Sequence, residues 1–212
     1  DSRHAINLFI VEKDMPGFAV GKKEDKLGAR GLPSCPLYFE NVFIPEKNRL
    51  GEEGHGFKAV MEGFSGFRPV IGARAVGLAQ GAIDHAIEFL KNRYTWKTRV
   101  SDYQGVRWML ADMQMQTEAA RLMIYKAAAM VDAGVTGEAL ALQASMAKAF
   151  ATDVAMKVTT DAVQLFGATG ISNDCPINRY MRDAKVTQII EGTNQIQRNI
   201  IGNMMLGRPE RR

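Results

Sequence analysis

The stretch VMEGFSGFRPVIGARAVGLAQGAIDHAIEFL, residues 60–90, decides the fold class of this chain. Its apolar residues recur at steps of four and three: Val60, Phe64, Phe67, Ile71, Ala75, Leu78, Ala82, Ala86 and Phe89. This spacing follows the period of the α-helix and puts one apolar stripe along one face. We therefore expect a long helix that begins near Gly56, with a kink or a restart at Pro69.

Two more stripes of the same period follow. One runs from Val106 to Val131 and ends at Ala133-Gly134, and the other runs from Leu140 to Leu165 and ends in the sequence FGATG. We expect shorter helices over residues 177–188 and 194–206. The third stripe is rich in alanine, which lets neighbouring helices approach closely. Such helices, joined by short connections, predict an up-down helical bundle over residues 51–212.

Residues 1–50 have a different character, since short apolar runs alternate with turn signals. NLFIV (7–11) and LYFENVFI (37–44) have the composition of strands. A few strands alone leave their edges and one apolar face uncovered. We expect the remnant of an antiparallel β-barrel domain, so the fold class is mostly α with a partial antiparallel β domain before the bundle. The chain also starts within an apolar pattern, which suggests a piece of a longer protein.

The composition limits the classes of function. Apolar residues make up 46% and charged residues 24%, a balance typical of globular proteins. The net charge of +4 is spread along the chain, so we expect no nucleic-acid partner. No window approaches the roughly 18 apolar residues of a membrane span. The histidines share no spacing, so we expect no metal site, and the two isolated cysteines favour a reducing compartment.

Glu191 stands out in the stretch QIIEGTNQIQRN, residues 188–199. It follows two isoleucines and precedes Gly192 and Thr193, which suit a helix end and the N-cap of a new helix. A carboxylate near apolar groups is costly unless it is paired or used. Two interpretations stay open from this pattern alone. Glu191 is either an exposed glutamate in a tight turn or a general base.

Three other features have both a functional and an ordinary interpretation. QLFGATG, residues 164–170, has glycines that suit either a phosphate contact or the C-terminal end of a helix. Arg68 lies in the stretch FSGFRPV, and Arg93 lies near the end of the first long helix. Either guanidinium is suited to a phosphate, and either is equally ordinary as a surface arginine.

Five segments together resemble the acyl-CoA dehydrogenases. They are EDKLGARG, LGEEGHGFKAVMEGF, RPVIGARAVGLAQGAIDHA, DAVQLFGATG and RYMRDAKVTQIIEGTNQIQR. The resemblance runs from residue 6 to residue 206, with the same order and spacing of segments. It implies the latter part of the family's middle β domain followed by its C-terminal helical domain.

The resemblance implies that Glu191 is the catalytic base. Some relatives carry the base immediately before the arginine that corresponds to Arg68, but here that position is Phe67. The implied reaction is α,β-dehydrogenation of an acyl-CoA thioester to the trans-2-enoyl-CoA, in which Glu191 takes the α-proton and FAD takes a hydride at N5. Backbone near Gly192 would bind the thioester oxygen, and Arg68 would help to hold the CoA portion.

The resemblance also implies the residues that contact FAD. Two groups would contact the flavin of a neighbouring subunit: Arg93, Thr95, Tyr103 and Gln104, and then Gln164, Leu165, Phe166, Gly167 and Ala168. A third group would contact the subunit's own flavin: Thr193, Asn194 and Gln195. A flavin shared in this way requires a homo-oligomer, a dimer or a dimer of dimers (a homotetramer). Trp96-Lys97 replaces the family's usual Phe-Gly after the flavin arginine, so the family's phosphate geometry is not implied there. Ser65 replaces an aspartate found near the CoA in medium-chain members, so no chain-length preference is implied.

The implied setting is fatty acid β-oxidation, with an electron-transfer flavoprotein as the redox partner. The expected location is the cytoplasm in a bacterium and the mitochondrial matrix in a eukaryote. Two rival functions stay open: a non-catalytic helical module that associates with itself or with partners, and an acyl-CoA oxidase, which shares the chemistry but passes electrons to oxygen.

Overall fold

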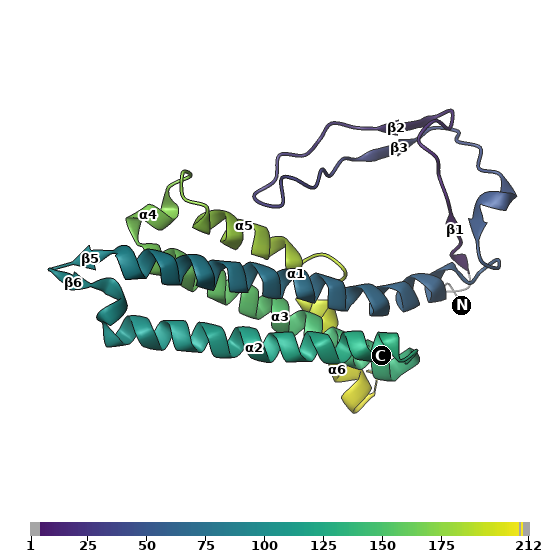
Figure 1. Ribbon diagram of the computed structural model, residues 1–212. Helices are drawn as coiled ribbons and strands as arrows, with labels where there is room; N and C mark the ends of the chain where they lie inside the picture. The colour runs from purple at the N-terminus through teal and green to yellow at the C-terminus, as the bar shows by residue number, and fades with distance from the viewer. Residues whose placement is uncertain (1–4, 208, 210–212) are drawn as a thin grey trace. The chain divides into compact units, whose positions relative to one another are not determined.

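The computed structural model describes residues 5–207 and residue 209. The chain divides into two compact units, Asp1–Phe64 and Ser65–Arg212, and helix α1 contributes residues to both. The boundary predicted between residues 50 and 51 stays a prediction. The predicted fold class is confirmed, because long helices make up most of the chain and short antiparallel strands precede them (Figure 1).

The first unit holds two small antiparallel sheets. Strand β1 (Leu8–Phe9) pairs with β4 (Arg49–Leu50), which follows a short 3-10 helix, η2 (Glu46–Asn48). Strand β2 (Phe18–Val20) pairs with β3 (Leu37–Phe39), and Ala19 lies opposite Tyr38. The strand predicted over residues 37–44 was too long. It ends at Phe39 because Asn41 has a positive φ of 52°, which breaks extended pairing.

Three long helices confirm the three apolar stripes. Helix α1 (Gly56–Asn92) is continuous through Pro69, so of the two predicted alternatives, a kink or a restart, the restart does not occur. Helix α2 (Gln104–Asp132) and helix α3 (Gly137–Phe166) follow it. Between α1 and α2 lies a hairpin of β5 (Tyr94–Thr95) and β6 (Thr98–Arg99), then a 3-10 turn, η3 (Val100–Asp102). The sequence did not indicate this hairpin, because its turn residues, Trp96 and Lys97, adopt positive φ without a glycine.

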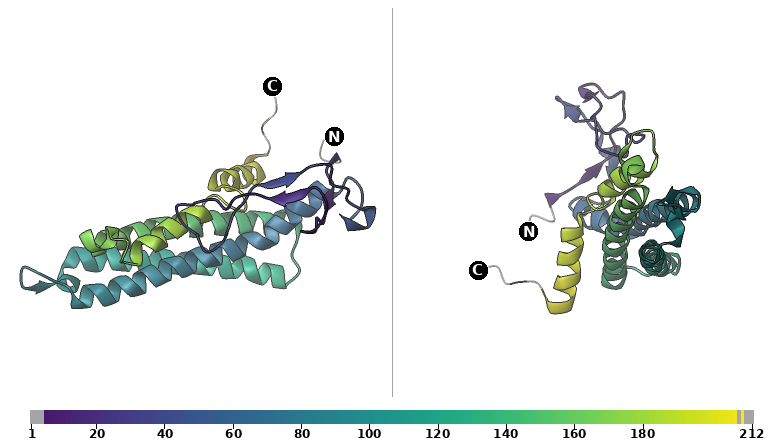
Figure 2. Two further views of the ribbon diagram at one scale, coloured as in Figure 1. Left: turned by 90° about the horizontal axis from the view of Figure 1, so that it is seen from above. Right: turned by 90° about the vertical axis from the view of Figure 1, so that its left-hand side faces the viewer.

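Helix α3 is the centre of the second unit. It packs against α2 and against the shorter helices α5 (Ile177–Thr187) and α6 (Asn194–Leu206), while the single-turn helix α4 (Ala168–Ile171) follows its C-terminal end. The end-on view in Figure 2 shows helices on several sides of α3. Five of its alanines are almost fully buried, which allows these close approaches: Ala144, Ala147, Ala151, Ala155 and Ala162. No helix in the described part of the chain has the length and apolarity to cross a membrane.

Candidate active site

The turn between α5 and α6 carries Glu191. Glu191 and Gly192 both have left-handed backbone conformations, with φ of 54° and 86°. The amide of Asn194 donates to the carbonyl of Gln188 (3.0 Å) across the turn. Thr193 is the N-cap of α6, because its hydroxyl accepts a hydrogen bond from the Ile196 amide at 3.3 Å. The predicted helix junction is therefore confirmed, and a non-glycine residue with φ above zero occupies its centre.

Two buried side chains hold the carbonyls of this turn. Gln197 Nε2 donates to the Glu191 carbonyl at 3.1 Å and to the Gly192 carbonyl at 2.9 Å. Lys148 Nζ, from α3, donates to the same Gly192 carbonyl at 2.9 Å and to Asn194 Oδ1 at 2.9 Å. Both side chains are fully buried. The backbone around Glu191 is thus fixed from the interior of the bundle.

The charges around Glu191 are buried cations. Arg68 of α1 is 4% exposed, and its Nη1 donates to Ser145 Oγ at 3.4 Å. Burial lowers the pKa of Arg68, and the negative charge of Glu191 partly opposes that shift. Burial and the nearby Arg68 lower the pKa of Lys148 to about 8, against the attraction of Asp153 and Glu191. Glu191, which is half-buried, therefore has two buried cations beside it, Arg68 and Lys148.

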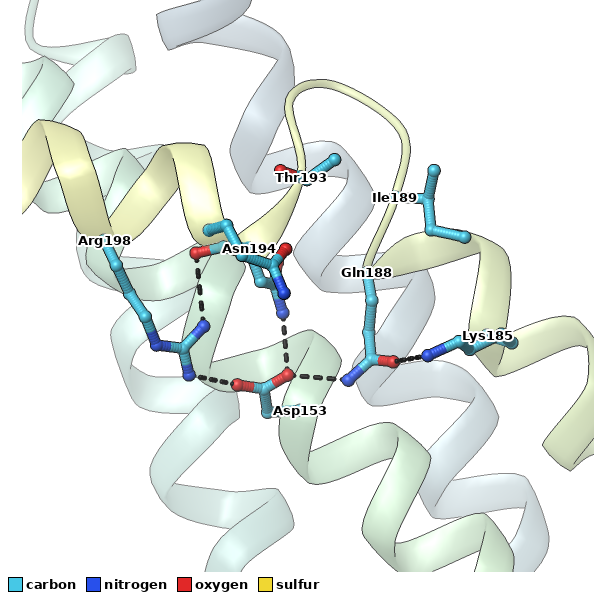
Figure 3. A pocket seen from close by; sticks show the side chains of 8 residues that line it. Asp153, Lys185, Gln188, Ile189, Thr193, Asn194 and Arg198 are labelled. Carbon is cyan, nitrogen blue, oxygen red and sulfur yellow. Dashed lines mark hydrogen bonds and ion pairs between the residues drawn. The ribbon is translucent and has the colours of Figure 1, made fainter.

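A pocket of about 390 Å³ lies beside the turn (Figure 3). Asp153 on its wall accepts hydrogen bonds from Gln188 (2.7 Å), Asn194 (2.7 Å) and Arg198 (2.6 Å). Burial alone would raise the pKa of Asp153, but these hydrogen bonds outweigh it and the pKa lies below its ordinary value. Thr193, Asn194 and Gln195 all line this pocket. The Asn194 side chain is buried and bonded within the chain, whereas Gln195 is exposed.

The residues predicted to contact a neighbour's flavin lie at another place, the hairpin end of the bundle. Arg93, Thr95 and Gln104 are exposed there, and Tyr103 Oη donates to the Thr95 carbonyl at 3.1 Å. The Arg93 carbonyl accepts from the amide of Val100 (2.8 Å), which closes the hairpin. Within residues 5–207, no hydrogen bond or ion pair engages the Arg93 guanidinium, so this exposed cation is available to an anionic ligand.

The segment Gln164–Ala168 lies at the same end of the bundle, where α3 meets α4 (Figure 1). The ring of Phe166 stacks on that of Phe89 from α1, with centroids 4.1 Å apart, and so ties this segment to the end of α1. Gly167 has φ of 59°, and the space that a Cβ would occupy there is open to 4 Å. Leu165 is half-buried, while Gln164 and Ala168 are exposed. The structure therefore brings the two predicted flavin groups together and keeps both apart from the Glu191 turn.

Sequence reasoning missed the residues that support the turn. They are Lys148, Asp153, Gln188, Gln197 and Arg198. One signal was available for Lys148, since it directly follows Ala147 in the apolar stripe of the third helix. A charged residue beside a buried face is either paired or functional. No local pattern pointed to the other four.

The structure is a helical bundle whose Glu191 turn is held from the interior and whose hairpin end carries exposed polar residues. It agrees with a match to a family model. Residues 54–206 match the model described as acyl-CoA dehydrogenase, C-terminal domain. The chain belongs to the acyl-CoA dehydrogenase family.

Particular relatives support this assignment. The probable acyl-CoA dehydrogenase FadE25 of Mycobacterium tuberculosis is 52% identical over 203 residues, which cover 96% of this chain and 52% of the relative. The structure of butyryl-CoA dehydrogenase from Megasphaera elsdenii superposes with a TM-score of 0.93 at 45% identity, over 96% of this chain and 52% of that one. A chain from the structure of an electron transferring flavoprotein of Acidaminococcus fermentans gives a TM-score of 0.93 at 46% identity, over 96% and 53%. The chain spans about half the length of the curated relatives it matches.

Proposed function

We propose that the protein to which this chain belongs oxidises acyl-CoA thioesters to trans-2-enoyl-CoA thioesters, with Glu191 as the base. The observation that carries this proposal is the place of Glu191, in a left-handed turn that interacts with two buried cations, Arg68 and Lys148. Relatives named acyl-CoA dehydrogenases support the class of substrate.

The chain's own residues act on the α-proton. Glu191 supplies the carboxylate that accepts this proton, and the buried cations Arg68 and Lys148 lie near it. The carbonyls of Glu191 and Gly192 are bonded to the interior, and a trans peptide directs its N–H away from its carbonyl. The amides of Gly192 and Thr193 therefore face away from Gln197, where they are suited to donate to the thioester oxygen as negative charge develops on it.

The hairpin end fits FAD. The exposed Arg93 suits a pyrophosphate, the exposed amides of Gln104 and Gln164 offer donors, and open space over Gly167 admits close approach to the backbone. These residues would hold the flavin of a neighbouring subunit, while Thr193 and Gln195 would contact the subunit's own. FAD, when bound, would supply the acceptor for the β-hydrogen as a hydride at N5. The similarity to a chain from an electron transferring flavoprotein structure supports such a protein as the redox partner.

The test follows the visible absorbance of the FAD-loaded protein during anaerobic addition of acyl-CoA thioesters, beginning with butyryl-CoA. We expect the flavin bands to bleach with at least one thioester. In Glu191→Gln the rate of bleaching should fall by at least about 100-fold, because the base is lost. Glu118→Gln is the matched control, since Glu118 lies on the surface of α2 and pairs with Arg121 at 3.0 Å; its rate should not change.

Three outcomes would contradict the proposal. A protein that takes up no FAD would favour the helical association module. Bleaching at the wild-type rate in Glu191→Gln would remove Glu191 from the role of base. In a parallel aerobic assay, rapid consumption of oxygen without an electron-transfer partner would favour an acyl-CoA oxidase and contradict the proposed redox partner.

A further inference from the structure

Lys148 is a fully buried lysine in an otherwise small and apolar stretch of α3. Its helical neighbours Ala144, Ala147 and Ala151 are among the most buried residues of the core. An ammonium group withdrawn from water is costly unless its donors are satisfied. The bonds that satisfy Lys148 therefore indicate what the side chain does.

In the described part of the chain, the amine donates to two groups, one in the Glu191 turn and one in the residue that begins α6. Lys148 Nζ lies 2.9 Å from the Gly192 carbonyl and 2.9 Å from Asn194 Oδ1. Asn194 is the first residue of α6, and its own amide group donates to Asp153 Oδ1 at 2.7 Å and to Thr152 Oγ1 at 2.8 Å. One side chain of α3 thus joins the carbonyl next to Glu191 to the start of the following helix.

The conformation of Glu191 needs such support. A non-glycine residue with φ near 54° is strained, and it persists only where surrounding interactions determine it. Lys148 and Gln197 bind the same Gly192 carbonyl from the interior, which fixes the peptide that follows the Glu191–Gly192 pair. If that carbonyl were released, the turn could relax and the Glu191 carboxylate would change its direction.

We propose that Lys148 is a positioning residue for Glu191: by binding the Gly192 carbonyl and the Asn194 side chain, it holds the turn that presents the carboxylate to the substrate. This inference rests on the proposed role of Glu191 as the base. Lys148 itself touches neither substrate nor flavin.

The charges that face Lys148 add a second, measurable effect. They are Arg68 on α1, Asp153 on α3 and Glu191 in the turn, while Arg198 of α6 is paired with Asp153 at 2.6 Å. The pKa of Lys148 is about 8, so above that pH the amine loses its charge and its hydrogen bonds to the Gly192 carbonyl and to Asn194 weaken. The wild-type rate should therefore fall on the alkaline side, and this fall should be absent in Lys148→Met.

The experiment compares two variants in the FAD-loaded protein: Lys148→Met, whose unbranched side chain is one atom shorter and has no donor, and Lys148→Gln, which keeps a donor. Flavin content, the limiting rate of flavin reduction, the half-saturating thioester concentration and the pH profile are measured. For Lys148→Met we expect the rate to fall by about 10- to 100-fold, with half-saturation changed by less than about threefold. The rate of flavin reduction should fall less in Lys148→Gln. This variant is used for the test if Lys148→Met does not fold. Lys157→Met, an exposed lysine of the same helix paired with Asp161 at 2.6 Å, is the control.

The outcomes separate the two proposals. If the wild-type flavin bleaches and Glu191→Gln does not, but the folded Lys148 variants keep the wild-type rate and pH profile, the positioning role is wrong. If no thioester bleaches the wild type, or if Glu191→Gln bleaches normally, the role of Glu191 fails and the role of Lys148 fails with it. A crystal structure of Lys148→Met that retains φ of Glu191 near its present value would also overturn the positioning role.

Discussion

At the scale of single residues, the Glu191 turn is held by groups that are distant in sequence. A left-handed non-glycine residue costs about 1–3 kcal/mol. Local sequence predicted the turn itself, because Gly192 and Thr193 are typical of helix ends and starts. It could not predict the φ of Glu191, since the supporting amine of Lys148 lies 44 residues before Gly192 in the chain. Long-range hydrogen bonds of this kind leave no local pattern.

Lys148 should make stability depend on pH. Its pKa is about 8 in the folded state and 10.5 ordinarily, so the unfolded chain binds the extra proton between these values. The free energy of unfolding should therefore rise with pH from about 8 to 10.5, by up to about 3 kcal/mol, and Lys148 should contribute no slope below pH 8. Urea unfolding at pH 7.5 and pH 10 measures this rise.

The control for this prediction is the variant Lys148→Met, in which the lysine's share of the slope should vanish. Other lysines and tyrosines titrate in the same range, so the difference between wild type and variant is the quantity that matters. Equal slopes in the two proteins would mean that Lys148 keeps an ordinary affinity for protons in the folded state.

At the scale of elements, α3 organises the bundle because nearly its whole circumference is buried. Its apolar stripe was predictable from period and composition. The short helix α4 was not, because the sequence FGATG indicated only the end of a helix. Gly170 explains why α4 packs closely. A Cβ on Gly170 would lie 2.6 Å from the Val163 carbonyl oxygen, which is backbone that cannot easily move.

We expect Gly170→Ala to loosen the packing of α4 on α3. The added methyl should lower the free energy of unfolding by about 1–3 kcal/mol and weaken retention of FAD, since Gln164–Ala168 leads directly into α4. Urea unfolding and flavin content after gel filtration measure both effects. Thr169→Ala, an exposed neighbour in the same short helix, should change neither. A Gly170→Ala protein with unchanged stability would contradict the packing argument.

At the scale of the whole molecule, α2 presents an apolar row to solvent. Trp108, Met115 and Leu122 recur every seven residues and are 62%, 63% and 61% exposed. A row with this spacing is typical of helices that pack against another helix. The sequence predicted a homo-oligomer only through family resemblance, because periodicity alone marked the inner stripe of α2 and gave no reason to examine its outer face.

We expect a second copy of the chain to cover this row. The double variant Met115→Glu and Leu122→Glu should lower the mass of the assembly in sedimentation equilibrium, because each carboxylate would have to be buried in the contact. Gln114→Glu places the same group on another face of α2 and should leave the mass unchanged. An unchanged mass in the double variant would show that other surfaces hold the subunits together.

The fully buried amine of Lys148 also offers a way to measure local opening of the protein by chemical labelling. In its unprotonated form the amine of Lys148 is nucleophilic and reacts with acylating reagents. It has no exposed surface, so an acylating reagent can reach it only while α6 and its preceding turn are detached from α3. The labelling rate of Lys148 can be compared with that of exposed lysines of the same chain. Their ratio would therefore measure how often the region around Glu191 opens.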